Sequence, residues 1–223
     1  GWSPQQIARR LRSIWPGQPE RHVSHETIYL AIYAYPRGEL KRQLISYLRQ
    51  ADGKRPKRTQ SNVRRERYPA HLSIHLRPPE VADRLVPGHW ESDLIMGANN
   101  RSAVATMVER TSRYVILAKL EAPTAEAAAE AIVREMSRMA PSLLKTMTHD
   151  QGSEMARHAE ITARTGMKIY FADPHSPWQR GSNENTNGLL RQYLPKGTDL
   201  SLVTQARLDE IADLLNTRPR QTL

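Results

Sequence analysis

The sequence predicts an α/β fold, in which a mixed five-stranded sheet flanked by helices follows a small all-helical region. Apolar residues recur at helical spacing through the first fifty positions. After Gly88, β-rich and helical segments follow one another in the order β-β-β-α-β-α-β-α-α. An antiparallel start followed by alternating elements is typical of a mixed sheet covered by helices.

Three short helices are expected in the first region. Ser3 as N-cap, Pro4 at the first helical position and Gln6 closing a capping box predict a helix over residues 3–14. A second helix is expected from Ser24 and a third near 39–49. Short helices with basic outer faces suit a DNA-binding module, while an arm that only packs is the open alternative. The inward residues are expected to be Ile7, Leu11 and Ile14, then Ile28, Ala31 and Ile32, then Leu40, Leu44 and Leu48.

Charge divides the chain into two parts. Residues 1–87 hold 17 Lys/Arg and 7 Asp/Glu, whereas residues 88–223 hold 16 of each, so the net charge of +10 lies entirely in the first part. Such an excess points to a polyanionic partner. The absence of cysteine excludes disulfides, a thiolate nucleophile and Cys-ligated zinc, and fits a reducing, cytosolic setting. No apolar run approaches the ~18 residues of a membrane helix.

A basic tract connects the two parts. Residues 52–69 contain one acid after Asp52 and almost nothing apolar, so they cannot bury a core and should be disordered when free. We expect a linker that tracks DNA phosphates, the alternative being a solvated linker without a partner. The Pro-rich residues 70–88 look extended. The expected domains are therefore 1–51, 52–87 and 88–223. The DNA-contacting residues of the tract are expected to be Lys54, Arg55, Lys57, Arg58, Arg64, Arg65 and Arg67.

The second part is expected to contain the chemistry. The TSR motif between the second and third strands predicts a hairpin. The predicted strands are 90–96, 102–109, 113–120, 145–149 and 167–171, and the predicted helices are 124–139, 154–165, 182–193 and 204–215.

Three acids stand at places that can share one edge of this sheet. Asp93 lies inside the first strand, Asp150 directly follows the fourth, and Glu184 lies in the first turn of a helix. Two carboxylates about 4 Å apart repel by roughly 4 kcal/mol at an effective dielectric near 20. Three together would splay, take up a proton or recruit a metal, and hard oxygen ligands suit Mg²⁺ or Mn²⁺. Two such ions, roughly 3.5–4 Å apart, can drive an in-line phosphoryl displacement without a protein nucleophile.

Other residues compete for these roles. Glu91 shares the strand face of Asp93 and is its main rival, while Asp173 and Glu154 are weaker rivals for the third acid. The scattered histidines do not make a zinc set; His149 is expected to tune Asp150 or touch DNA. Trp178 could stack on a base or pack in the core.

The segments GHWESDLIMG, THDQGSEMARH and DPHSPWQRGSNENTNGLLRQYLPKGTDL resemble the catalytic signatures of the insertion-sequence-thirty family of bacterial transposases, and the likeness extends over residues 2–223. The resemblance implies a ribonuclease-H-like integrase core. It also implies that Asp93, Asp150 and Glu184 hold two Mg²⁺ or Mn²⁺ ions. Arg191 matches a basic residue expected to contact DNA, and Arg180 and Asn187 of the same segment are expected to do so as well.

By the same resemblance, the protein would cleave DNA at the ends of an insertion sequence and join those ends to target DNA. Holding two double-stranded DNA ends implies a homodimer or a larger assembly. The family's members carry a further helix-turn-helix region before the matching part and continue beyond it, so we expect this chain to be truncated at both ends. A metal-dependent nuclease of the same fold, or a DNA-binding regulator with an unused catalytic core, is the alternative.

Overall fold

The computed structural model describes residues 2–36, 38–48, 68–174 and 176–218. The chain forms two compact units, one of residues 1–61 with 217–223 and one of residues 62–216. No helix in these described ranges is long and apolar enough to cross a lipid bilayer.

The smaller unit contains the three expected helices. They are α1 (Pro4–Ile14), α2 (His25–Ala34) and α3 (Glu39–Ser46). The predicted capping box is present, since the Ser3 hydroxyl accepts from the Gln6 amide and the Gln6 side chain accepts from the Ser3 amide. Neither α2 nor α3 buries a residue completely. Of the predicted inward residues, Ile28, Ile32, Leu44 and Leu48 are half-buried, whereas Ala31 and Leu40 are exposed, as is Ile14 of α1. So small a unit has too little interior to cover three apolar stripes. A basic outer face is also wrong for α2, which contains no Lys or Arg.

The larger unit is a five-stranded sheet in the order β3-β2-β1-β4-β5. β1 pairs antiparallel with β2 and parallel with β4, which places two strands distant in sequence side by side at the centre. The predicted mixed sheet and the β2–β3 hairpin are confirmed. The strands are β1 (His89–Met96), β2 (Ala103–Glu109), β3 (Val115–Lys119), β4 (Thr146–His149) and β5 (Lys168–Phe171).

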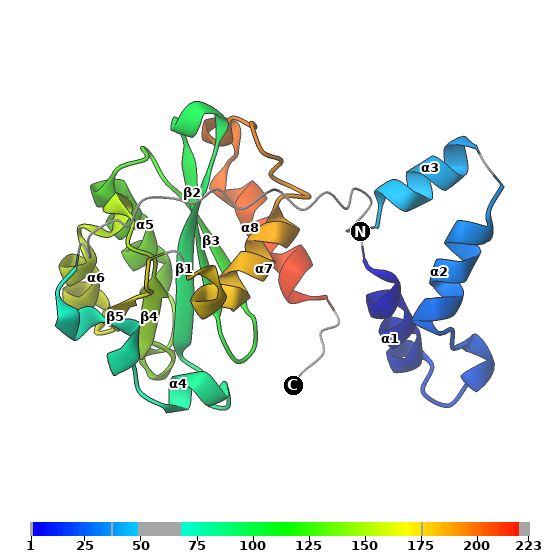
Figure 1. Ribbon diagram of the computed structural model, residues 1–223, viewed down its shortest axis with the longest axis horizontal. Helices are drawn as coiled ribbons and strands as arrows, with labels where there is room; N and C mark the ends of the chain where they lie inside the picture. The colour runs from blue at the N-terminus through cyan, green and yellow to red at the C-terminus, as the bar shows by residue number, and fades with distance from the viewer. Residues whose placement is uncertain (1, 37, 49–67, 175, 219–223) are drawn as a thin grey trace. The chain divides into compact units, whose positions relative to one another are not determined.

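Helices cover both faces of this sheet. Figure 1 shows α5 and α6 on one side and α7 and α8 on the other. The alternation of β1 separates two apolar cores: Trp90 packs in the cluster that includes α5, and Ile95 packs in the cluster that includes α7 and α8. Glu91 and Asp93 therefore share the face of Ile95 and point toward α7. The helices are α5 (Ala125–Met136), α6 (His158–Thr165), α7 (Gly181–Leu190) and α8 (Gln205–Asn216).

Residues 68–88 differ from the expected extended approach. They form the short turns Ala70–Leu72 and Ile74–Leu76 and the one-turn helix α4 (Glu80–Asp83). Ile74 and Val81 are buried, and Ser73 forms an isolated bridge with Phe171 of β5. The apolar residues between the prolines thus dock the segment on the larger unit. The predicted helix 154–165 is likewise divided into a turn, Ser153–Met155, and α6.

Candidate active site

Asp93 and Asp150 lie at neighbouring places on the parallel strands β1 and β4. Glu91 is the register partner of Thr148, and each acid follows two residues later on its own chain. Both carboxylates contact Arg180, whose Nη1 lies 3.5 Å from Asp93 Oδ2 and whose Nη2 donates to Asp150 Oδ2 at 3.1 Å. The sheet order therefore brings these two sequence-predicted acids to one edge of the sheet, although 56 residues separate them in the chain. We call this edge, with Asp93 and Asp150, the carboxylate rim.

Asp93 is held on several sides. Its Oδ1 accepts from the Leu94 amide at 2.9 Å, and its Oδ2 accepts from the Asn187 side-chain amide at 3.0 Å. Burial raises the pKa of Asp93, the Arg180 charge lowers it, and the negative charge of Asp150 raises it again, with a net rise. The fold therefore works against ionisation of this carboxyl, and a further cation at the rim would favour its charged form.

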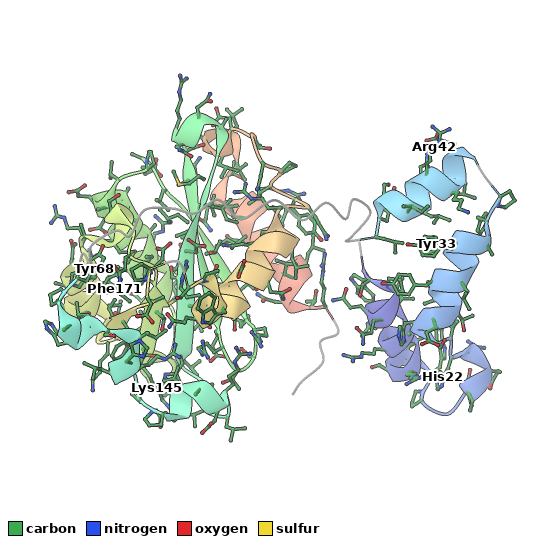
Figure 2. The ribbon with its side chains drawn as sticks, viewed as in Figure 1. His22, Tyr33, Arg42, Tyr68, Lys145 and Phe171 are labelled. Carbon is green, nitrogen blue, oxygen red and sulfur yellow. The ribbon has the colours of Figure 1, made fainter. Side chains whose placement is uncertain are left out.

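Asp150 is more open, with 43% of its side chain exposed. It begins the loop after β4, where the Gln151 side chain donates to the Ala172 carbonyl at 3.2 Å. The Tyr68 hydroxyl donates to the Gly152 carbonyl at 2.6 Å. Tyr68 also stacks on Phe171, with ring centroids 3.6 Å apart and planes 4° from parallel. Figure 2 labels the two residues side by side. Tyr68, next to the end of the basic tract, thus holds the loop that bears Asp150.

Glu184 lies in the first turn of α7 and is exposed. Glu184 and Asn187, three residues apart, share one stripe of the helix, and Arg180, the N-cap of α7, stands at the start of that stripe. Both neighbours contact Asp93, and further along this stripe Arg191 donates to the Met96 carbonyl at 3.3 Å. The stripe faces β1, but Glu184 itself is not brought into contact with the other two acids. Within the described ranges, no three His, Asp or Glu side chains form a group that could hold a metal.

The rival acid Glu91 has a different setting. It is fully buried, pairs with Arg110 and accepts from the Asn183 backbone amide at 2.8 Å. The Asn183 side chain also donates to the Glu91 carbonyl at 3.0 Å. Glu91 therefore has a structural role: its ion pair and its hydrogen bonds with Asn183 hold the start of α7 against β1. The enclosed carboxylate cannot reach solvent or substrate.

The remaining candidates separate by exposure and contacts. His149 is buried, and burial lowers its pKa to about 3, which contradicts the expected contact with DNA. The alternative role, tuning Asp150, stays a prediction. Trp178 is 65% exposed, which excludes the core alternative. Asp173 accepts from Gln179 of its own loop and from His75 of the turn Ile74–Leu76, so two partners outside the carboxylate rim already engage it. Outside the described residues or side chains lie His175, Glu154 and the basic residues predicted in the tract: Lys54, Arg55, Lys57, Arg58, Arg64, Arg65 and Arg67.

Some residues around the rim escaped the sequence reasoning. Arg110 and Tyr68 carry no local pattern that distinguishes them from surface arginines or linker tyrosines. Asn183 was expected either to contact phosphate or to start the helix, and in the structure it binds Glu91 at the start of α7. Arg180 and Asn187 were assigned to DNA, and in the structure they contact the acids. The QRGSNEN sequence around Glu184 was the available signal, because polar residues at this density on a helix packed against a sheet need partners.

Comparison with known proteins agrees with this geometry. Residues 83–177 match the family described as integrase core domain, a range that includes Asp93 and Asp150 and ends before Glu184. The chain is 60% identical over its whole length to the transposase for insertion sequence element IS1086 of Cupriavidus metallidurans. It is 43% identical to the transposase InsI for insertion sequence element IS30A of Escherichia coli, and 39% identical to the transposase for insertion sequence element IS4351 of Bacteroides fragilis. The chain spans 66%, 58% and 66% of these relatives' lengths.

Proposed function

The chain belongs to the insertion-sequence-thirty family of transposases, and from this membership we propose that it cuts DNA at insertion-sequence ends and joins them to target DNA. The observation that carries the proposal is the meeting of Asp93 and Asp150 on adjacent parallel strands beneath α7. Hydrolysis of a phosphodiester at the element end would free a 3′-hydroxyl. Attack of that hydroxyl on target DNA is a transesterification, which needs no high-energy cofactor.

The donor set fits a hard divalent cation. Asp93 and Asp150 offer carboxylate oxygens at one rim, where burial and then the neighbouring charge of Asp150 raise the pKa of Asp93. Mg²⁺ favours one or two protein carboxylates and keeps positions for water and phosphate. Bound there, two Mg²⁺ or Mn²⁺ ions would activate the attacking oxygen and stabilise the leaving one.

Glu184 is proposed as the third ligand because of its place on α7. It lies between Arg180 and Asn187 on the stripe that faces β1, and both neighbours already contact Asp93. Its side chain is exposed, whereas Glu91 is enclosed and Asp173 is bound by Gln179 and His75. A rotamer change, without movement of the helix, would bring its charge closer to the pair.

DNA contacts are proposed for both parts of the chain. Residues 88–223 would be the catalytic core, with Arg180, Asn187 and Arg191 on the stripe nearest the scissile phosphate. Residues 1–51 would be the helical DNA-binding region, and the 52–87 linker with its basic tract would add phosphate contacts. Synapsis of two DNA ends would take a dimer or a larger assembly. The site of action would be bacterial DNA, hence the cytoplasm and nucleoid.

The test is a strand-transfer assay with pre-cut element ends in Mn²⁺. Asp150→Asn should lower joining by more than about a hundredfold, because even the loss of a residue that only supports a metal ligand costs 10–100-fold. Its DNA affinity should remain. The matched control is Glu126→Gln, which removes an exposed carboxylate from α5 on the opposite face of the sheet. Cleavage without joining in the wild type would instead indicate a nuclease, and unchanged activity in Asp150→Asn would leave only a DNA-binding regulator.

A further inference from the structure

Arg180 occupies the oxygens that the proposed site would offer to a cation. Its two terminal nitrogens lie 3.5 and 3.1 Å from the Oδ2 atoms of Asp93 and Asp150. Nη1 also donates to the Ser92 carbonyl at 3.1 Å, and only 12% of the side chain is exposed. One guanidinium therefore bridges the two central strands at the carboxylate rim.

The carboxylate of Asp93 has few lone pairs left for a further donor or cation. Oδ1 accepts from the Leu94 amide, and Oδ2 faces both the Asn187 amide and Arg180. A carboxylate oxygen has two lone pairs, so a cation on Oδ2 would have to displace one of these donors. Arg180 is the donor that would leave, because its positive charge repels a divalent cation and the neutral amide does not.

The remaining contacts of Arg180 suggest that it can leave. Its Nε is buried and makes no hydrogen bond to the described residues. A buried donor without a partner costs free energy, so the present position depends on the two carboxylates. Once these take up a cation, the guanidinium loses its main attraction there.

We propose that Arg180 competes with the divalent cation for Asp93 and Asp150, and so sets the cation concentration at which the site fills. This inference rests on the proposed function, since it assumes that these acids are the metal ligands. Arg180 acts here as a positioning residue: it pairs the acids before the cation arrives and is released toward substrate phosphate when the cation binds. A guanidinium suits both partners, because its planar fork matches carboxylate and phosphate alike.

The experiment is a calorimetric titration of Mn²⁺ into the 223-residue chain without DNA. Arg180→Gln should bind Mn²⁺ about tenfold more tightly than the wild type, because the energy of roughly one charge-assisted hydrogen bond no longer opposes binding. Arg180→Lys keeps the charge without the fork and should fall between them. Arg164→Gln is the matched control: its guanidinium pairs with Glu130 and Glu160 on the opposite face of the sheet, so its Mn²⁺ affinity should equal that of the wild type.

The outcomes separate this inference from the proposed function. Wild-type Mn²⁺ binding that disappears in Asp150→Asn, together with unchanged or weaker binding in Arg180→Gln, would overturn the competition and leave the function standing. Absence of Mn²⁺ binding in the wild type and in Arg180→Gln alike would overturn both. If Arg180→Gln fails to fold by circular dichroism, Arg180→Lys decides, and an affinity no higher than wild type overturns the inference.

Discussion

The two sides of the carboxylate rim are supported in different ways. On the β1 side, Asp93 lies within a strand, two residues from the enclosed pair of Glu91 and Arg110. On the β4 side, Asp150 lies just past a strand end, in a loop held by Tyr68 through one hydrogen bond to Gly152 and by stacking on Phe171.

Glu91 and Asp93 are both carboxylates of β1, but their surroundings give them different roles. Glu91 and Asp93 share a strand face, yet one is fully buried with satisfied partners and the other is only partly covered, with a raised pKa. Because Glu91 is fully paired, it has a structural role. Because Asp93 is incompletely paired, a bound cation would stabilise its ionised form. The β1 side is therefore expected to be rigid, and the β4 side adjustable.

The largest effect is expected at the buried pair. Glu91→Gln should lower the free energy of unfolding by about 3–5 kcal/mol, because it leaves Arg110 as an unpaired buried charge. Urea denaturation followed by circular dichroism measures this. Glu130→Gln, which breaks an exposed pair with Arg164, should change little. Equal midpoints for the two variants would remove the distinction between the sides.

A smaller effect is expected on the β4 side. Tyr68→Phe keeps the stacked ring and removes the hydrogen bond to Gly152, so stability should fall by about 1 kcal/mol. Because the loop bears Asp150, Mn²⁺ affinity should fall as well. Tyr114→Phe, at an exposed position, is the control for both measurements. A stability loss without any change in Mn²⁺ affinity would show that the loop does not depend on Tyr68 for its geometry.

The smallest effect is expected at Asp93, where a substitution should raise stability instead of lowering it. A carboxyl whose folded-state pKa is raised stabilises the fold below its unfolded pKa, and this contribution is lost as pH rises through the folded pKa. Ionised Asp93 therefore costs stability at neutral pH, and Asp93→Asn should unfold at a slightly higher temperature than the wild type. The gain should shrink as pH falls toward 4. Thermal melts at pH 7 and pH 4 test this, and a lower neutral midpoint in Asp93→Asn would contradict it.

Local patterns were sufficient for much of the fold. The order of strands and helices, the hairpin before Val115 and the Ser3–Gln6 box all depend on neighbouring residues and are confirmed. Docking of residues 68–88 was missed because prolines suggested an extended chain, while Leu72, Ile74 and Val81 pack through tertiary contacts. The inward stripes of α2 and α3 are confirmed only in part, with Ala31 and Leu40 exposed, because helical periodicity marks an apolar face without saying what covers it.

The sequence predicted which acids belong to the candidate site, but not which residues contact them. The positions of Asp93 and Asp150 followed from strand ends and motif resemblance. The choice between Asp93 and Glu91 needed burial, since two residues on one strand face look alike in sequence. The bridging role of Arg180 depends on distances across three elements, which no spacing rule supplies.

The central position of β1 has a consequence for the timing of folding. Its parallel partner β4 is made only after β2, β3 and α5, and α7 is made later still. Long-range pairing of this kind forms late, because closing a long loop precedes any gain from the contact. On the proposed assignment, a nascent chain that ends after β3 contains Asp93 but neither Asp150 nor Glu184, so it has no catalytic site. DNA cutting would then begin only once synthesis has passed α7, so unfinished polypeptides would leave the genome untouched.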